Sequence, residues 1–156
     1  MKNKVYIETS VLQDVFVLAP NLRQDDKNEA MALNLTPQSA LLRGFVYSDE
    51  CYTVKFKNQP IGMFGVSKYD MPNRFGSVWY FGSDECTNHP FTFVKQGIIY
   101  TNRWLEDYDI LINAVDSRNK SHIEWLRRIG MTITSPIFIN GYKFLQFYKI
   151  KEKNNV

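Results

Sequence analysis

The chain has 156 residues, of which 44% are hydrophobic, 22% charged and 15% aromatic, and its formal net charge at pH 7 is +3. This composition is ordinary for a globular protein, and the length predicts one domain over residues 1–156 with a frayed tail at 150–156. A small net charge without a dense basic stripe argues against a nucleic-acid partner. No stretch approaches the length of a membrane span, so we expect no membrane partner.

Only two cysteines occur, Cys51 and Cys86, and they lie far apart and outside any CxxC pattern. The sequence therefore supports neither a disulfide framework nor a structural zinc site, and we expect no metal. The first residues lack the apolar core of a signal peptide. Together these features predict a protein made for a reducing cytoplasm.

The first part of the chain predicts a short strand, three helices and a strand pair. Pro20 ends the first helical pattern, and Thr36-Pro37 is typical of a helix N-terminus. Asn58-Gln59 separates two alternating runs and predicts a hairpin turn. The expected elements span residues 5–7, 11–18, 26–35, 36–43, 51–57 and 60–66.

Residues 71–76 are loop-like, and the rest of the chain predicts strand, helix, strand, helix and two strands. The expected elements span residues 77–81, 90–107, 110–115, 121–130, 131–138 and 142–150. The expected buried face of the 90–107 helix consists of Phe91, Val94, Ile98 and Leu105.

Local signals mark the ends of the last elements. Ser121 and Glu124 have the spacing of a capping box at a helix start, and Gly130 suits a left-handed helix end. Asn140-Gly141 is a strong hairpin signal. A helix between two apolar strands implies a right-handed parallel crossover. These patterns predict a mixed sheet covered by helices.

Residues 115–131 resemble the strand-to-helix segment near the end of GNAT acetyltransferases, with Asn119 and Gly130 at matching positions. The order of elements over almost the whole chain is similar as well. A narrower resemblance is to GNAT-like proteins of tailed bacteriophages that are related to a small internal virion protein of podophages. Its shared stretches are Ser48–Cys51, Gly82–Asp84, His89-Pro90, Tyr108-Asp109, Asn113–Asp116, Asn119, His122–Leu126 and Phe144–Phe147.

The resemblance implies the GNAT α/β fold, which is a mixed six- to seven-stranded sheet with helices on both faces and splayed central parallel strands. It implies acetyl-CoA between the splayed strands, an amine as the acyl acceptor, and the host cytoplasm during infection, or the virion, as the location. Pantetheine would pair with the backbone of the fourth strand and with an Asn side chain. The implied cofactor-binding residues are Tyr80, Phe81, Gly82, Ser83, Asn119 and His122.

Two positions depart from the family pattern. The family holds the pyrophosphate of coenzyme A on a glycine-rich turn at a helix N-terminus, but this chain has no glycine between Gly82 and Gly97. The family often has a Tyr that protonates the leaving thiolate, and its position is Leu126 here. Both departures weaken the case for tight binding and turnover.

Several candidate residues have two interpretations. Asp84 and Glu85 are candidate general bases for the amine, or loop carboxylates beside a helix N-terminus. His122 either contacts a ligand or is a hydrogen-bonded core histidine. Asn119 either binds pantetheine or is a turn residue. Cys86 has no basic neighbour in sequence, so we expect no cysteine mechanism. The aromatic residues expected in the core are Trp79, Tyr80, Phe81, Phe91 and Phe93.

Two functions of different classes follow. The first is a phage-encoded, acetyl-CoA-dependent N-acyltransferase that acts through direct attack of a deprotonated amine on the thioester. The second is a non-catalytic internal virion or assembly protein that keeps the fold as a scaffold and binds other virion proteins.

Overall fold

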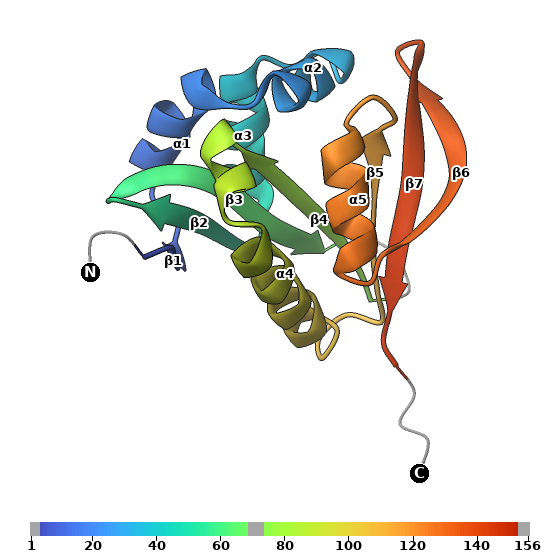
Figure 1. Ribbon diagram of the computed structural model, residues 1–156. Helices are drawn as coiled ribbons and strands as arrows, with labels where there is room; N and C mark the ends of the chain where they lie inside the picture. Colours follow the sequence, from blue (N-terminus) through green and yellow to red (C-terminus); the bar gives the residue numbers. More distant parts are fainter. Residues whose placement is uncertain (1–3, 69–73, 153–156) are drawn as a thin grey trace.

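The computed structural model describes residues 4–68 and 74–152. One mixed sheet runs through the molecule, and helices lie on both of its faces (Figure 1). The elements in chain order are β1 (Tyr6–Thr9), α1 (Leu12–Leu18), the 3-10 helix η1 (Ala19–Asn21), α2 (Gln24–Ala32), α3 (Pro37–Tyr47), β2 (Glu50–Phe56), β3 (Gln59–Lys68), β4 (Phe75–Gly82), the 3-10 helix η2 (Asp84–Asn88), α4 (Pro90–Trp104), β5 (Ile110–Asp116), α5 (Lys120–Arg128), β6 (Thr132–Ile139) and β7 (Tyr142–Ile150).

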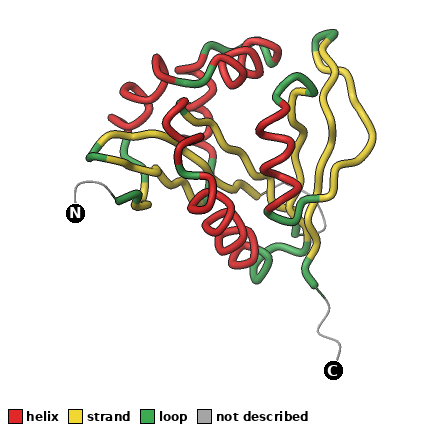
Figure 2. Tube along the Cα trace, in the orientation of Figure 1, coloured by secondary structure: helices red, strands yellow, loops and turns green. Residues whose placement is uncertain are grey.

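The seven strands are ordered β1-β2-β3-β4-β5-β7-β6, and β4 and β5 are the parallel pair. Figure 2 shows the strands in yellow and the helices in red. Successive side chains of a strand point to opposite faces, so each strand contributes to two cores. Val66 and Val78 pack with α4 and α5, whereas Met63 and Phe81 pack with α1, α2 and α3. The predicted mixed sheet with helices on both faces is confirmed.

Strands β4 and β5 pair over only three residues each. Phe75, Gly76 and Ser77 lie opposite Ile110, Leu111 and Ile112, and no later pair forms between the two strands. β4 instead stays with β3 as far as Gly82, and β5 stays with β7 as far as Asp116. The two strands therefore diverge at their carboxyl ends, as predicted, and we call the gap between them the splay.

Several boundaries differ from the prediction. α2 begins at Gln24 and ends at Ala32, before Asn34, whose φ of 61° is left-handed. α3 has the predicted Thr36 cap but continues to Tyr47. The first hairpin turns at Lys57-Asn58, with φ values of 53° and 62°, so Gln59 belongs to β3 rather than to the turn.

The predicted loop at 71–76 is only partly testable, because 71–73 lie outside the described residues; Phe75 and Gly76 belong to β4. The expected tail at 150–156 is likewise described only to residue 152, and Ile150 ends β7. The two glycine signals are confirmed. Gly130 follows α5 with φ of 97°, and Asn140-Gly141 turns the last hairpin with φ values of 51° and 83°.

The predicted capping box at Ser121 is wrong. α5 begins at Lys120 with Asn119 as its cap residue, so Ser121 lies inside the first turn. A capping box requires the hydroxyl residue to precede the helix. The Ser121 hydroxyl instead accepts a hydrogen bond from Arg23 of the segment before α2.

The predicted buried position of Phe91 is also wrong, because its side chain is 91% exposed. Helical side chains point toward the helix N-terminus, so a residue in the first turn projects beyond its own helix. The buried face of α4 lies further along, at Thr101 and Trp104, while Ile98 is 37% exposed. Of the other expected core aromatics, Phe81 is buried, whereas Trp79, Tyr80 and Phe93 are half-buried.

Candidate active site

The alternating directions of the β4 backbone decide which of its N–H and carbonyl groups point into the splay, where a ligand could bond to them. Ser83 N–H donates to the carbonyl of Ile61 in β3 at 2.8 Å. Alternate residues of an antiparallel strand face the same neighbour, so Phe81 also faces β3. Tyr80 and Gly82 therefore face the splay. Of the predicted backbone contacts, those of Phe81 and Ser83 are directed away from the gap.

The narrow end of the splay is bridged by one amide side chain. Asn113 Nδ2 donates to the carbonyl of Val78 at 2.6 Å, and Asn113 Oδ1 accepts from Ala114 N–H at 2.7 Å. Asn113 thus replaces the ladder hydrogen bonds that the diverging strands no longer make.

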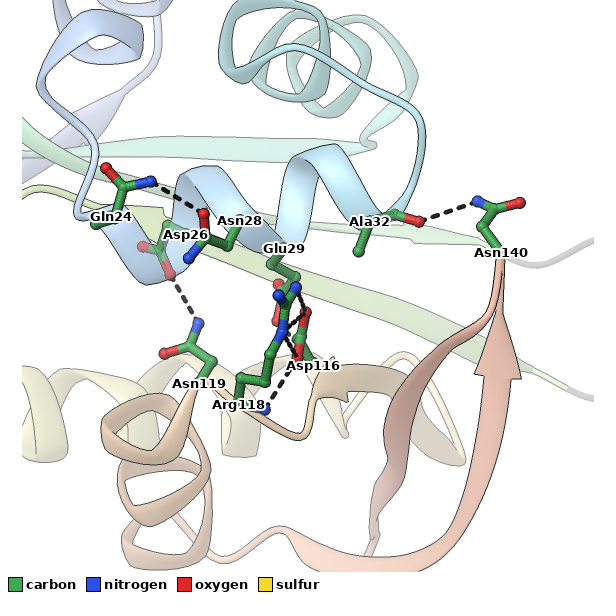
Figure 3. A network of polar contacts seen from close by, with 9 residues as sticks. All are labelled: Gln24, Asp26, Asn28, Glu29, Ala32, Asp116, Arg118, Asn119 and Asn140. Carbon is green, nitrogen blue, oxygen red and sulfur yellow. Dashed lines mark hydrogen bonds and ion pairs between the residues drawn. The ribbon is translucent and has the colours of Figure 1, made fainter.

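The wide end is bridged by α2. Asp26 and Glu29 are three residues apart and lie on one face of the helix, pointing toward β5 and the start of α5 (Figure 3). Asp26 Oδ2 accepts from Gly82 N–H at 2.8 Å, and Glu29 Oε1 accepts from Asp116 N–H at 2.8 Å. The Gly82 carbonyl accepts from Arg23 N–H at 2.9 Å. Both backbone groups of Gly82 are therefore occupied. Of the predicted backbone contacts, those of Tyr80 face the splay without a hydrogen-bond partner in the described part of the chain.

Asn119 belongs to the same network. Asn119 is only 1% exposed, and its Oδ1 accepts from Arg23 at 2.9 Å. Its Nδ2 donates to Asp26 at 2.9 Å (Figure 3). Arg23 in turn pairs with Asp26 at 2.9 Å. The amide that the family resemblance assigns to pantetheine is thus bound to α2, and a ligand has to compete with Arg23 and Asp26 for it.

Two hollows adjoin the splay. The inner cavity, of about 160 Å³, lies between the sheet, α4 and α5 and extends to Glu29 of α2. The outer cleft, of about 250 Å³, lies between η2, the start of α4 and α5, and includes Arg23 and Arg128.

Four aromatic residues line both hollows: Tyr80, Phe93, His122 and Trp125. The Tyr80 ring lies 5.9 Å from Phe93, 5.5 Å from His122 and 5.1 Å from Trp125, measured between centroids. The Trp125 indole also donates to the Phe93 carbonyl at 3.1 Å, which ties α5 to α4. These four residues, here named the aromatic wall, separate the inner cavity from the outer cleft.

His122 is the polar member of the aromatic wall. It is 8% exposed, and its buried Nδ1 has no hydrogen-bond partner among the described residues. Burial lowers the pKa of His122 to about 4, so the imidazole is neutral at pH 7. Buried nitrogens are rarely left unpaired, so this atom is suited to a polar group of a ligand. The structure does not show the hydrogen-bonded core histidine of the alternative interpretation.

The predicted bases Asp84 and Glu85 lie in η2, and neither lines a hollow. Asp84 is exposed. Glu85 accepts from Asn88 Nδ2 at 2.9 Å and lies 3.3 Å from His89 Nε2. This arrangement favours their interpretation as loop carboxylates. Cys86, next to them, is buried and donates to the Ile61 carbonyl; burial raises the pKa of its thiol to about 11, which keeps it unreactive.

Glu29 is a site residue that the sequence prediction did not identify. It is 6% exposed and lines the inner cavity, and burial raises its pKa to about 8. Its neighbour Asp26 pairs with Arg23. Asp116 pairs with Arg118 at 2.7 Å; burial alone would raise its pKa, but the hydrogen bonds from Arg118 lower it. No lysine or arginine of the described residues lies within 4.0 Å of Glu29.

Solved structures with the same fold are GNAT-family acetyltransferases. A GNAT-family acetyltransferase from Bacillus anthracis has a TM-score of 0.70 and 10% identity, covering 98% of both chains. The ribosomal-protein-S5-alanine acetyltransferase from Vibrio fischeri has a TM-score of 0.65 and 15% identity, covering 96% of this chain and 94% of that chain. AAC(6′)-Ib in complex with ribostamycin and coenzyme A has a TM-score of 0.69 and 10% identity, covering 95% and 94%. The protein therefore has the GNAT acetyltransferase fold.

The sequence itself matches no protein-family model and no curated protein. Within residues 4–68 and 74–152, no group of three or more His, Cys, Asp or Glu side chains is arranged to hold a metal ion. Among the helices of that same part of the chain, none is long and apolar enough to span a membrane.

Proposed function

We propose that the protein is an acyltransferase that transfers the acetyl group of acetyl-CoA to an amine. The observation that carries this proposal is the splay, which opens into an inner cavity while the backbone N–H and carbonyl of Tyr80 face it. An amide-rich pantetheine arm is complementary to such an unpaired strand edge. Among proteins of the same fold, AAC(6′)-Ib is known in complexes with coenzyme A and with acetyl-CoA.

Three groups of the chain fit this substrate. Tyr80 would pair with pantetheine, and His122 Nδ1 would gain the partner that it lacks. The outer cleft would take the nucleotide end, where Arg23 and Arg128 supply positive charge in place of the missing glycine turn. Because Arg23 already pairs with Asp26 at 2.9 Å and Arg128 with Glu124 at 3.3 Å, we expect this anion site to be weaker than a glycine-rich helix N-terminus.

The second candidate function is the non-catalytic scaffold. It is favoured by the network of α2, in which the backbone of Gly82 and the amide of Asn119 are already bonded to Arg23 and Asp26. A protein that uses these groups to hold α2 needs no ligand in the splay. The resemblance to phage proteins supports a phage-encoded protein in the host cytoplasm or virion under either function.

Calorimetric titration with acetyl-CoA separates the two functions. Binding with 1:1 stoichiometry is expected, and acetyl-CoA at ~100 times its dissociation constant should add about 2.7 kcal/mol to the unfolding free energy. The two histidines provide a matched pair of variants. His122→Phe should weaken binding about tenfold, because it removes one buried hydrogen-bonding nitrogen. His89→Phe changes a residue outside both hollows and should bind like the natural chain.

Transfer is followed by mass spectrometry with a panel of primary amines, including polyamines and aminoglycosides. Formation of N-acetylated product with release of the free thiol supports the enzyme. No detectable binding at millimolar acetyl-CoA contradicts the enzyme and leaves the scaffold. Binding that is equally weakened by both histidine variants contradicts the placement of the substrate at the aromatic wall.

A further inference from the structure

We infer that Glu29 of α2 is the proton acceptor for the amine that attacks the thioester. The inference rests on the proposed acyl transfer, and it assigns a catalytic role to a residue outside the predicted set of Asp84 and Glu85. It follows from the position of Glu29, from the absence of a lysine or arginine partner for it among the described residues, and from the inner cavity that Glu29 lines.

Glu29 lies at the wide end of the splay. Glu29 Oε1 is held by Asp116 N–H at 2.8 Å, on the last residue of β5, so the carboxyl group sits at the wide end of the splay. Glu29 lines the inner cavity together with Tyr80, Asn113 and Ala114. Any acyl group that lies between the two strands is therefore bounded by Glu29 on the α2 side. Asp84 and Glu85 line neither the inner cavity nor the outer cleft.

The buried carboxylates at the wide end of the splay differ from one another in their charged neighbours. Asp26 is 2.9 Å from Arg23, and Asp116 is 2.7 Å from Arg118, so each already has a cation. Among residues 4–68 and 74–152, no lysine or arginine pairs with Glu29, and the charged groups that face it are Asp26 from its own helix and Asp116 from β5. An incoming ammonium group would thus meet a buried carboxyl group that no lysine or arginine of the described residues already neutralises.

The ionisation of Glu29 agrees with this role. Burial, followed by the nearby Asp116 and Asp26 charges, raises its pKa to about 8, although the bond from Asp116 N–H opposes the shift. A general base works best when its pKa lies near the pH at which the enzyme operates. A carboxylate of ordinary pKa would be a far weaker base toward an alkylammonium ion.

In the proposed acyl transfer, every proton and every electron pair is accounted for within one catalytic cycle. The ammonium group gives one proton to the Glu29 carboxylate and becomes a neutral amine. The amine nitrogen forms a C–N bond to the thioester carbonyl carbon, and the C–S bond breaks with its electron pair on sulfur. The second proton lost by nitrogen goes to the thiolate. The products are the amide, the free thiol of coenzyme A and protonated Glu29, which then releases its proton to solvent.

Glu29→Gln tests the assignment, because the amide keeps an oxygen for Asp116 N–H but cannot accept a proton. We expect kcat to fall about 100-fold or more, while the dissociation constant of acetyl-CoA stays within about twofold. The pH–rate profile of the natural chain should rise with a pKa near 8, and the variant should lose that limb. Glu85→Gln tests the rival base, and the exposed Glu106→Gln is the surface control. Both should keep the natural rate and profile.

A second readout needs no substrate. Infrared difference spectroscopy of the free protein should show the C=O band of a protonated, buried carboxyl group that disappears with a midpoint near pH 8 and is missing in Glu29→Gln. Natural kcat in Glu29→Gln, or a loss of rate in Glu85→Gln instead, overturns the assignment. So does a titration of Glu29 near its ordinary value in the infrared spectra. If the natural chain neither binds nor uses acetyl-CoA, the proposed function fails as well, and the infrared band still reports the ionisation of Glu29 separately.

Discussion

The buried side chains of Glu29 and His122 at the splay predict that the unfolding free energy depends on pH in an unusual way. Burial raises the pKa of Glu29 from its ordinary value of 4.5 to about 8, so the folded chain holds a proton that the unfolded chain has lost. The stabilisation is complete below pH 4.5 and disappears as the pH rises through 8. At 1.36 kcal/mol for each pH unit, the total effect is about 5 kcal/mol, and the part between pH 6.5 and 8 is about 2 kcal/mol.

His122 acts in the opposite direction over a lower range. Burial lowers its pKa from 6.5 to about 4, so the unfolded chain binds a proton that the folded chain does not. Stability from this group is therefore full above pH 6.5 and is lost as the pH falls through 4, with a total of about 3 kcal/mol. The two effects largely cancel between pH 4.5 and 6.5, and only the Glu29 effect remains above pH 6.5.

Urea unfolding of the natural chain and of Glu29→Gln at pH 6.5, 7, 7.5 and 8 measures the Glu29 effect alone. The natural chain should lose about 2 kcal/mol over this range relative to the variant, because a glutamine has no proton to lose. Taking the difference between the two proteins removes the contributions of all other groups. A difference that stays constant from pH 6.5 to 8 would refute the burial argument for Glu29.

Three further substitutions test the structure around α5. Gly130→Val should lower the unfolding free energy by more than about 1 kcal/mol in urea melts, because φ at this residue is 97°. Ser121→Ala should cost about 1 kcal/mol or less in the same melts, since it removes an Arg23 bond rather than a helix cap. Asn119→Ala should cost about 1–3 kcal/mol by leaving Asp26 short of a donor, and hydrogen exchange at Gly82 N–H should accelerate.

The sequence predicted the elements whose signals are local. The apolar runs at 77–81 and 110–115 and the helix between them were sufficient for the parallel pair, since a crossover of that kind leaves few alternatives. The residue types of Gly130 and Asn140-Gly141 predicted their left-handed conformations, because few other residues adopt such conformations. The capping box failed because Ser-x-x-Glu also occurs inside helices, and spacing alone does not say which residue is the first.

The site depended on contacts between residues far apart in the chain. Glu29 and Asp116 are 87 positions apart, and Asp26 and Gly82 are 56 apart. The sequence of a short helix does not indicate that its acidic side chains will bond to two diverging strands. The one available signal was that Asp26 and Glu29 share a helix face with Ala30 close by in the core. Asp84 and Glu85 were predicted as general bases because they come soon after the expected strand at 77–81.

The aromatic wall has a consequence for the speed of binding. A thioester that enters from the outer cleft has to displace the packed rings of Tyr80, Phe93, His122 and Trp125 and break the bond from the Trp125 indole to the Phe93 carbonyl. Entry is then a two-step process, in which diffusion to the cleft is followed by ring movement. The observed association rate should level off at high ligand concentration at the rate at which the rings part. In the proposed acyl transfer, the free thiol of coenzyme A would cross the same barrier as it leaves, so the wall would set an upper limit on turnover.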